Sequence, residues 1–347
     1  MANFAPKAAF VSIRAAVAAV AIAALAVCPA QLFAQSSPAP GKIEIRVKPI
    51  EAFQPAEPDR KIFGSLEFRG GLELSSSAKN FGGLSAIRVA PDGAGFLAIT
   101  DKAEWLRGRI VYRDNTPVGI ADAEMAPMLG PDGRVLTARG WYDTEALTLD
   151  GNAAYVALER IHRILRFDYG KDGLLARAQI VPTPPEMSKL PGNRGIECLI
   201  AMPKGTALAG ALMAISERGL DGDGNVRGFL IGGPKPGAFT VKRKDDFDIV
   251  DCASTPSSDL LLLERFFSWQ KGVAMRIRRV PLASVVPGAL LDGPSLIQAD
   301  MGFQIDNMEG LSVHRAADGT LVLTLVSDDN FSIIQRTLLL QFTLLDK

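Results

Sequence analysis

A repeated unit of strand, turn, strand and acidic residue restricts this 347-residue chain more than any other feature. Each copy has two short apolar runs separated by a turn, usually Pro-Asp-Gly or Asp-Gly, and the second run ends in an acidic residue. The second runs end at Asp101, Glu159, Glu217, Glu264 and Asp328, which are 47 to 64 residues apart. Short strands repeated at such a period, with loop insertions, predict an all-β protein and within that class a β-propeller.

The number of blades follows from how residues 63–74 are used. Five hairpins are evident, and residues 63–74 precede the first of them. An exposed sheet edge invites aggregation, so propellers often close by letting one end of the chain complete the blade begun by the other. We therefore expect five blades, with residues 63–74 as the outer strand of the C-terminal blade. If residues 43–80 instead build a blade of their own, the ring has six.

The first 34 residues have the pattern of a signal peptide. Lys7 and Arg14 precede an apolar run at residues 15–27, and small residues allow cleavage after Ala34. The run is too short to span a bilayer. Residues 25–28 resemble a lipoprotein box, but Val27 stands where a smaller residue is usual, so lipidation is the less favoured alternative. We expect a periplasmic or secreted protein without a transmembrane segment.

The remaining chain divides into residues 35–60, a linker with an N-terminal strand, and residues 61–347, the propeller domain. Lys and Arg number 38, as do Asp and Glu, and no basic block occurs, so nucleic-acid binding is not expected. Two histidines and three cysteines without a CxxC motif argue against a zinc or iron–sulfur site. We expect a monomer that acts on a small molecule.

The repeat predicts a ring of carboxylates. In an antiparallel hairpin the start of the first strand and the end of the second lie at the same end. Four pairs should therefore converge: Glu145 with Glu159, Glu197 with Glu217, Asp251 with Glu264, and Glu309 with Asp328. Crowded carboxylates repel one another unless they are protonated or bridged by a cation, and oxygen ligands favour Ca²⁺ or Mg²⁺. The alternative is that each acid pairs with the basic residue that follows its hairpin.

Several segments also resemble a known family. They are Gly82-Gly83-Leu84-Ser85, Asp143-Thr144-Glu145-Ala146, Asn193-Arg194-Gly195-Ile196-Glu197, Leu263-Glu264-Arg265-Phe266, Asn307-Met308-Glu309-Gly310-Leu311 and Ser327-Asp328-Asp329-Asn330-Phe331. In this order they resemble the phytase-like family of exported bacterial proteins, described as having esterase-like activity of the phytase type. The resemblance covers roughly residues 63–345. It implies a propeller and suggests hydrolysis of phosphate esters. Ala146 and Cys198 stand where the family usually has glycine.

The favoured hypothesis is Ca²⁺-assisted hydrolysis of phosphate esters at one mouth of the channel. The residues assigned to catalysis are Glu145, Glu197, Glu309 and Asp328. The metal ligands are expected among these four together with Asp143, Asp329 and Asn330. The residues assigned to the phosphate are Arg160, Arg194, Arg218 and Arg265.

Two other functions fit the same sequence. A non-catalytic periplasmic propeller would use the mouth to bind a small ligand or a partner. A metal-independent serine esterase would use Ser85 or Ser327 with His162 or His314, although no GxSxG motif is present.

Some remaining motifs are expected to be structural. The Asp-Gly-Asp-Gly-Asn run at 221–225 lacks the glutamate that completes a calcium loop, so it is interpreted as a turn. Cys198 and Cys252 stand at one position of successive repeats, where small buried residues are usual, and we expect them to be unpaired. The aromatic residues at 141–142 and 266–269 are expected to seal gaps between blades rather than wall a pocket.

Overall fold

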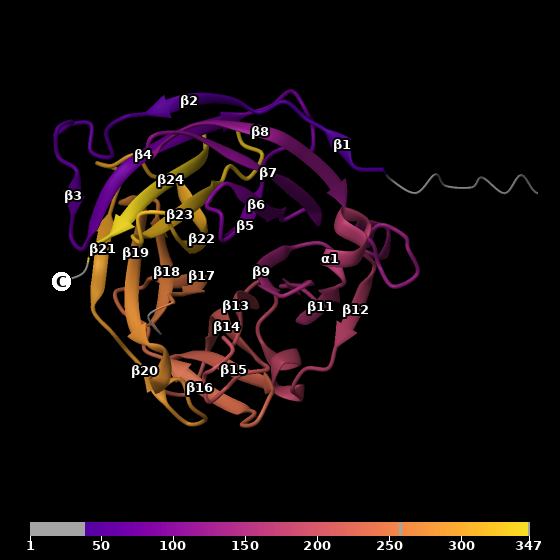
Figure 1. Ribbon diagram of the computed structural model, residues 1–347. Helices are drawn as coiled ribbons and strands as arrows, with labels where there is room; N and C mark the ends of the chain where they lie inside the picture. The colour runs from indigo at the N-terminus through magenta and orange to yellow at the C-terminus, as the bar shows by residue number, and fades with distance from the viewer. Residues whose placement is uncertain (1–38, 257–258, 346–347) are drawn as a thin grey trace, which may run out of the picture. The chain divides into compact units, whose positions relative to one another are not determined.

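Five antiparallel β-sheets follow one another around a central channel and form a five-bladed β-propeller (Figure 1). This computed structural model describes residues 39–256 and 259–345, which belong to one compact unit. The predicted signal peptide, residues 1–34, lies outside the described residues. Where the structure is described, the one α-helix is the four-residue α1 (Tyr169–Asp172), and no helix is long and apolar enough to cross a membrane.

Each blade begins with an inner strand at the channel and adds further strands outward. The first blade contains β5 (Leu84–Val89), β6 (Gly95–Thr100), β7 (Glu104–Arg113), β8 (Thr116–Pro127) and β1 (Gly41–Lys42). The second contains β9 (Thr144–Asp150), β10 (Ala153–Leu158), β11 (Arg163–Phe167) and β12 (Ala178–Val181). The third contains β13 (Ile196–Ala201), β14 (Ala211–Leu220), β15 (Val226–Gly232), β16 (Gly237–Val241) and β20 (Leu290–Leu291).

The fourth and fifth blades bring the chain back to its start. The fourth contains β17 (Asp248–Ser254), β18 (Asp259–Ser268), β19 (Gly272–Pro281) and β21 (Ser295–Ala299). The fifth contains β22 (Asn307–Arg315), β23 (Leu321–Asp328), β24 (Thr337–Leu344), β4 (Leu66–Ser75) and β2 (Arg46–Ile50), and β3 (Ile62–Phe63) pairs with β4. Short 3₁₀ turns lie at Leu136–Arg139, Gly173–Leu175, Pro185–Lys189 and Leu282–Ser284.

The ring closes through the fifth blade, as the sequence predicted. Strand β4 pairs antiparallel with β24, with Gly71 opposite Leu340, and β2 pairs with the other edge of β4. The six-bladed alternative is wrong, because residues 43–80 add strands to existing blades instead of forming a sheet of their own. Strand β2 lies in the segment that the sequence assigned to a linker and an N-terminal strand, so this strand is part of the ring.

Buried apolar side chains fill each interface between neighbouring blades. The described residues form five such clusters, and each joins strands of two adjacent blades. Aliphatic residues dominate them, but the interface of blades four and five also contains Phe53, which is fully buried against four other phenylalanines. Trp105 and Phe167 stack edge to face between blades one and two, with ring centroids 5.0 Å apart. These contacts hold the inner strands in a fixed ring.

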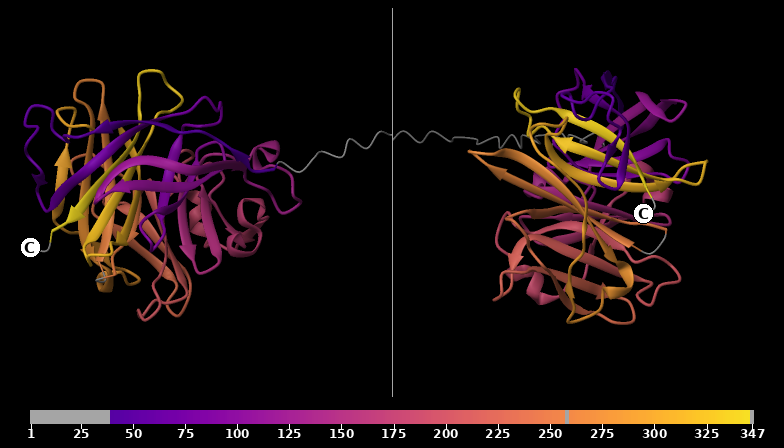
Figure 2. Two further views of the ribbon diagram at one scale, coloured as in Figure 1. Left: turned by 45° about the horizontal axis from the view of Figure 1, so that its top comes forward. Right: turned by 90° about the vertical axis from the view of Figure 1, so that its left-hand side faces the viewer.

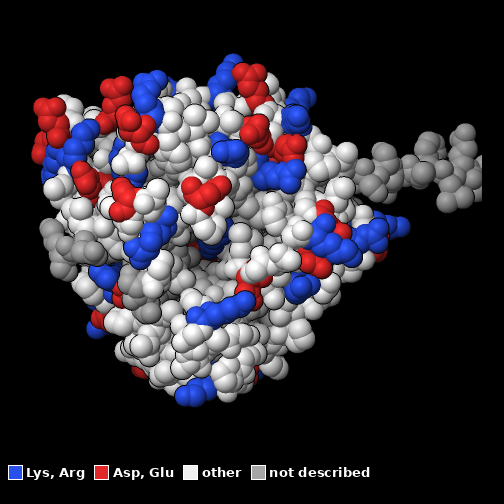
Figure 3. Space-filling view, viewed as in Figure 1, with Lys and Arg blue, Asp and Glu red and all other residues white. Residues whose placement is uncertain are grey.

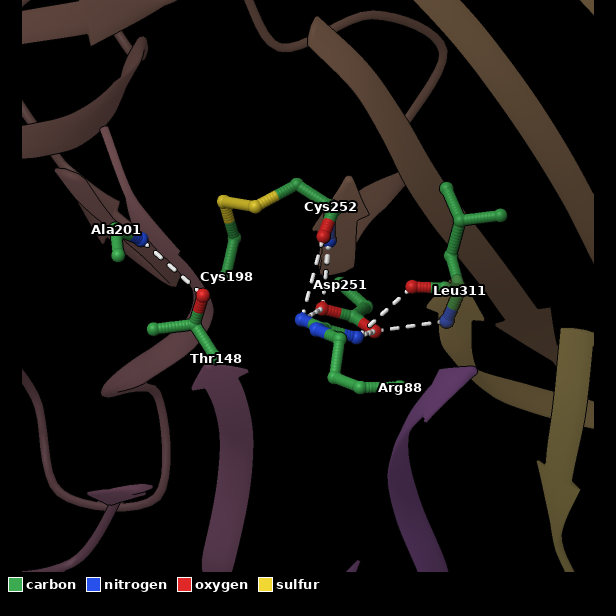
Figure 4. Close-up of a disulfide and its surroundings, with 7 residues drawn as sticks. All are labelled: Arg88, Thr148, Cys198, Ala201, Asp251, Cys252 and Leu311. Carbon is green, nitrogen blue, oxygen red and sulfur yellow. Dashed lines mark hydrogen bonds and ion pairs between the residues drawn. A yellow bond between two sulfur atoms is a disulfide. The ribbon is translucent and has the colours of Figure 1, made fainter. Parts of the chain in front are cut away.

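A buried ion pair crosses the middle of the channel (Figure 4). Arg88 on β5 donates from Nη1 and Nη2 to the two carboxylate oxygens of Asp251 on β17, at 2.9 Å each. The guanidinium also donates to the carbonyl oxygen of Leu311 on β22, at 2.8 Å. The backbone amides of Leu311 and Cys252 donate to the same carboxylate, at 2.7 Å each. The pair therefore connects the inner strands of blades one, four and five.

A disulfide between Cys198 on β13 and Cys252 on β17 links blades three and four, with the Cα atoms 5.1 Å apart (Figure 4). The prediction of two free cysteines is wrong, because the two residues are not at the same repeat position. Cys198 corresponds in register to Asp251, and Cys252 lies one residue further along. Successive residues of a strand face opposite sides, so this offset turns the two side chains toward each other across the interface.

Removing this disulfide is expected to destabilise the protein. The bond closes a segment of 54 residues, and a cross-link of this kind typically stabilises a fold by about 2–4 kcal/mol. We expect Cys198→Ser/Cys252→Ser to lower the free energy of unfolding by that amount, as measured by urea denaturation. The urea midpoint of the variant should be the same in oxidising and reducing buffer, because the variant has no disulfide to reduce. An equal stability of variant and wild type under oxidising conditions would contradict the bond.

Candidate functional site

A β-bulge interrupts each inner strand near the same end of the channel. The five residues skipped by the strand pairing are Ser85, Glu145, Glu197, Val250 and Glu309. A bulge leaves one residue out of the ladder and re-aims its side chain. Three of the five bulged residues are glutamates, and all three line a cavity at this mouth of the channel.

One residue at or near the mouth end of the second strand of each blade also lines this cavity. These residues are Asp101, Glu159, Glu217, Arg265 and Asp328. In three blades its backbone amide donates to the residue just before the inner strand, as Glu159 N does to Asp143 O at 2.8 Å. The hairpins of the second, third and fifth blades therefore place both side chains at the mouth, in agreement with the predicted convergence of Glu145 with Glu159, Glu197 with Glu217, and Glu309 with Asp328.

The predicted convergence of Asp251 with Glu264 is wrong. In the fourth blade Asp251 lies opposite Leu263, beyond the bulge, and its carboxylate binds Arg88 in the channel. Glu264 points away from the mouth and forms ion pairs with Arg276 and Arg278. The prediction placed the fourth copy of the repeat one residue out of register, because residue types alone do not locate the bulge at Val250. Arg265 therefore occupies the position that is acidic in the other four blades.

The mouth cavity has a volume of about 210 Å³ and a strongly acidic wall. Its lining residues are Asp101, Asp143, Glu145, Glu159, Asn193, Arg194, Glu197, Glu217, Arg265, Asn307, Glu309, Asp328 and Asn330. Eight carboxylates thus face two guanidinium groups. We call this the acidic mouth.

Burial and mutual repulsion hold several of these carboxyl groups partly protonated. Burial raises the pKa of Asp101 to about 6 and the pKa of Glu159 to about 7, and neighbouring carboxylates add to both shifts. The same causes raise the pKa of Asp328 to about 7 and that of Glu309 to about 8, although Arg265 opposes them. The pKa of Glu197 is raised well above its usual value by burial and by Glu217 and other acids of the mouth. The mouth therefore has more negative charge than the protein alone compensates.

The two arginines of the mouth converge on Glu217. Arg194 Nη1 donates to both carboxylate oxygens of Glu217, at 2.9 and 2.7 Å. Arg265 Nη2 lies 3.5 Å from Glu217, and its Nε lies 3.2 Å from Glu309 without forming a hydrogen bond. Burial would lower the pKa of Arg265, but the surrounding carboxylates raise it, so the guanidinium stays charged. The side chain is 24% exposed, and its Nε–H makes no hydrogen bond within the protein.

Several of the acids are arranged to hold a metal ion. Glu159, Glu197 and Glu217 each offer one carboxylate oxygen, and these three oxygens lie within 4.8 Å of one another. Two further oxygens of the mouth, Asp101 Oδ1 and Asp143 Oδ2, are buried without a hydrogen-bond partner. Asp143 Oδ2 lies 3.6 Å from Arg160 Nε, too far for a hydrogen bond. Buried oxygens that accept no hydrogen bond beside a carboxylate cluster fit a hard divalent cation, which prefers oxygen ligands.

Three residues of the mouth have a left-handed backbone conformation. The φ angles of Asp143, Asn193 and Asn330 are 63°, 57° and 47°. Asp143 immediately precedes β9, Asn193 lies three residues before β13, and Asn330 lies two residues after β23. The left-handed region is uncommon for residues other than glycine. Such conformations tend to occur where a loop must place groups at a functional site.

Other predicted residues lie outside the acidic mouth. Arg160 donates to the hydroxyl of Tyr142, and Arg218 forms an ion pair with Asp248. Asp329 accepts hydrogen bonds from Gly83 N, Phe331 N and Thr337 Oγ1, so its oxygens support the loop. Asp101 and Asn307 line the mouth but were not predicted as site residues, although the repeat marks Asp101 as the end of a hairpin.

The residues of the serine-esterase alternative are dispersed. Ser327 Oγ donates to Arg336 O at 2.6 Å, and Ser85 Oγ lies 3.4 Å from Gly83 O. His314 belongs to a second cavity, further along β22 from the mouth. Among the described residues no hydrogen bond joins either serine to a histidine.

Figure 3 views the end of the channel opposite the acidic mouth, where acidic and basic side chains are interspersed.

The raised pKa values predict how stability depends on pH. A carboxyl group whose folded pKa exceeds its unfolded pKa keeps its proton longer in the native state, so its contribution is present at low pH and is lost as pH rises through the folded value. Without a cation we expect the Tm to fall between pH 6 and pH 8.5, and Ca²⁺ to reverse the fall. Scanning fluorimetry with chelator or Ca²⁺ tests this, and Glu309→Gln should weaken the dependence. A Tm that rises over this range in chelator would be the contrary result.

The fold and the cavity together define a five-bladed propeller with a carboxylate-rich channel mouth. The model of the phytase-like family, described as "Esterase-like activity of phytase", matches residues 79–331, well over half of the chain. The protein therefore belongs to the phytase-like family. No curated protein matches the sequence.

The solved structures that match this chain are distant in both sequence and structure. The α-L-arabinofuranosidase PaAbf62A from Podospora anserina is 10% identical, with a TM-score of 0.45, over 76% of this chain and 92% of that chain. The glutaminyl cyclase of Myxococcus xanthus is 12% identical, with a TM-score of 0.35, over 76% and 97%. A chain of a nidogen/laminin complex is 7% identical, with a TM-score of 0.38, over 82% and 88%. Likenesses at this level do not contribute to the assignment of a function.

Proposed function

We propose that this protein is an exported phosphoric-ester hydrolase that uses a divalent cation, Ca²⁺ in the first place, at the acidic mouth. The observation that carries the proposal is the convergence of eight carboxylates and two arginines on one cavity. Membership of the phytase-like family supports the reaction class. The disulfide supports an oxidising compartment such as the periplasm or the exterior of the cell.

The carboxylates would hold the cation. Glu159, Glu197 and Glu217 form the cluster with the closest oxygens, and Asp101 and Asp143 each offer a buried oxygen that accepts no hydrogen bond. An all-carboxylate donor set favours Ca²⁺ or Mg²⁺ over softer metals. When bound, such a cation neutralises phosphate oxygens and lowers the pKa of a water molecule.

The protein's own residues would bind the phosphate and take up a proton. Arg265 is half-buried, stays charged and has an Nε–H without a hydrogen-bond acceptor, so its guanidinium would donate to a phosphate oxygen. Arg194 would assist from the other side of Glu217. Asp328, whose pKa is raised to about 7, would accept a proton from the attacking water near neutral pH. A protein nucleophile is not needed.

Phosphate release with and without chelator tests this function. The substrates are a generic phosphomonoester and inositol phosphates, and the protein is first stripped with chelator. We expect turnover to disappear with chelator and to return when Ca²⁺ is added. Turnover that chelator does not change would overturn the metal-assisted reaction. Bound Ca²⁺ without turnover on any ester would instead support the alternative of a non-catalytic binding propeller.

A further inference from the structure

Five large apolar side chains are exposed at the mouth end of blades four and five. Trp269 is 95% exposed, Ile333 102% and Ile334 86%, while Met301 and Phe267 are 62% and 51% exposed. Large contiguous apolar patches are rare on soluble monomers and mark binding sites. We call these five residues the apolar rim.

The hairpin between β18 and β19 carries the first part of the rim out of the mouth. Strand β18 pairs regularly with β19 from Arg265 to Ser268, so side chains two residues apart share a face. Arg265 lines the acidic mouth, and Phe267 therefore lies on the same side about 7 Å further out. The rings of Trp269 and Phe267 pack edge to face, with centroids 5.5 Å apart.

The rim continues from this hairpin to the fifth blade. Met301 packs on the hairpin turn, where a Cβ built on Gly272 would lie 2.8 Å from Met301 Cγ. The segment that follows Met301 accepts hydrogen bonds from Arg336, to Gln304 Oε1 at 2.8 Å and to Ile305 O at 3.0 Å. Arg336 ends the loop that carries Ile333 and Ile334. Figure 2 shows the β18–β19 turn and the β23–β24 loop projecting from the same end of the ring.

The exposure of Ile333 and Ile334 belongs to an ordered loop. Asp329 accepts the amides of Gly83 and Phe331, at 2.9 and 3.0 Å, and Arg336 N donates to Asp306 at 3.1 Å. Both ends of the loop are therefore fixed, while the two isoleucines face solvent. Exposing them gives up the free energy of burial, which a ligand would recover.

We infer that the apolar rim binds the leaving group of the substrate, and that the substrate is a monoester with one phosphate and an alkyl or aryl group. This inference rests on the proposed function. The acidic mouth is lined by charged and amide side chains alone, so an apolar group does not belong inside it. A phosphate at Arg265 places a leaving group of moderate length beside Phe267. Several phosphates on one ligand would face eight carboxylates and only two arginines.

The reaction itself is a simple hydrolysis. Water adds to phosphorus, the bond between phosphorus and the ester oxygen breaks, and the leaving oxygen takes up a proton. The products are inorganic phosphate and the free alcohol or phenol. The rim would act only on the apolar part of this leaving group, so its contribution appears as a preference among esters.

Ethyl phosphate and hexyl phosphate give the sharpest comparison, because their alcohols are leaving groups of nearly equal acidity. Partial burial of four additional methylene groups predicts a kcat/KM about tenfold higher for hexyl phosphate, used below the concentration at which it aggregates. The variant Trp269→Ser/Ile333→Ser should bring the ratio of the two kcat/KM values close to one. The matched control is Ile180→Ser, at a half-exposed position on β12 of the second blade, which should keep the wild-type ratio.

The outcomes separate this inference from the proposed function. If both esters are hydrolysed at equal kcat/KM, the rim has no role in substrate choice and the hydrolase remains. A second outcome is that neither ester is hydrolysed, but hexyl phosphate binds about tenfold more tightly than ethyl phosphate by calorimetry and only the rim variant loses this difference. In that case the rim is a ligand-binding site and the proposed hydrolase activity is wrong. Equal or absent binding of both esters overturns the inference. The inference is also overturned if the rim variant keeps the hexyl preference but loses binding to phosphatidylcholine vesicles. That result would identify the rim as a membrane contact.

Discussion

Glu197→Gln is expected to lower the rate of phosphate release by about a hundredfold or more. Glu197 is the bulged residue of β13, is 8% exposed, and belongs to the three-carboxylate cluster with Glu159 and Glu217. Glutamine keeps its shape and removes its charge, so the cation would lose a ligand while the packing is retained. Phosphate release is measured at saturating Ca²⁺ and again over a Ca²⁺ titration, because a lost ligand also weakens the binding of the cation.

The control for this experiment is Glu186→Gln. Glu186 is an exposed glutamate in the 3₁₀ turn Pro185–Lys189, away from the mouth, and its variant should match wild type. The Tm of both variants is measured in chelator to show that they are folded. If Glu197→Gln retained the wild-type rate and the wild-type affinity for Ca²⁺, the assignment of the cluster would be wrong.

Arg88→Met is expected to lower the free energy of unfolding by about 3–5 kcal/mol. The side chain of Asp251 is fully buried, and Arg88 is the cation that compensates its charge. Burial already raises the pKa of Asp251, and Arg88 opposes that rise. Removal of the guanidinium would leave an uncompensated carboxylate in the channel and break the connection among three inner strands.

Urea denaturation of Arg88→Met measures this loss. The matched control is Arg134→Met, because Arg134 forms an exposed ion pair with Asp132 at 3.9 Å and such pairs contribute little. We expect Arg134→Met to stay within about 0.5 kcal/mol of wild type. If the two variants lost the same small amount, the buried pair would not hold the ring together.

The repeat predicted most of the fold because each hairpin has its own turn signal and strand pattern. The five blades follow from the hairpins, and closure by residues 63–74 follows from the need to cover a sheet edge. The same repeat predicted that Glu145, Glu197, Glu309 and Asp328 share one mouth, because antiparallel pairing places the two ends of a hairpin together.

The sequence did not reveal features that depend on a shift of one residue. Each bulge moves a side chain by one position, so in the fourth blade Asp251 and Glu264 were wrongly assigned to the ring of carboxylates, where Arg265 occupies the equivalent position. The disulfide was missed for the same reason, since it joins residues offset by one register position. The apolar rim could not be predicted, because exposure of its residues depends on how the loops are held.

The most direct test of the account is a calorimetric titration of chelator-treated protein with Ca²⁺ at pH 8, with phosphate release measured on the same samples. We predict that Ca²⁺ binds, that turnover rises over the same range of Ca²⁺ concentration as binding, and that Glu197→Gln weakens both. Turnover at full rate in protein that binds no Ca²⁺ would contradict the account.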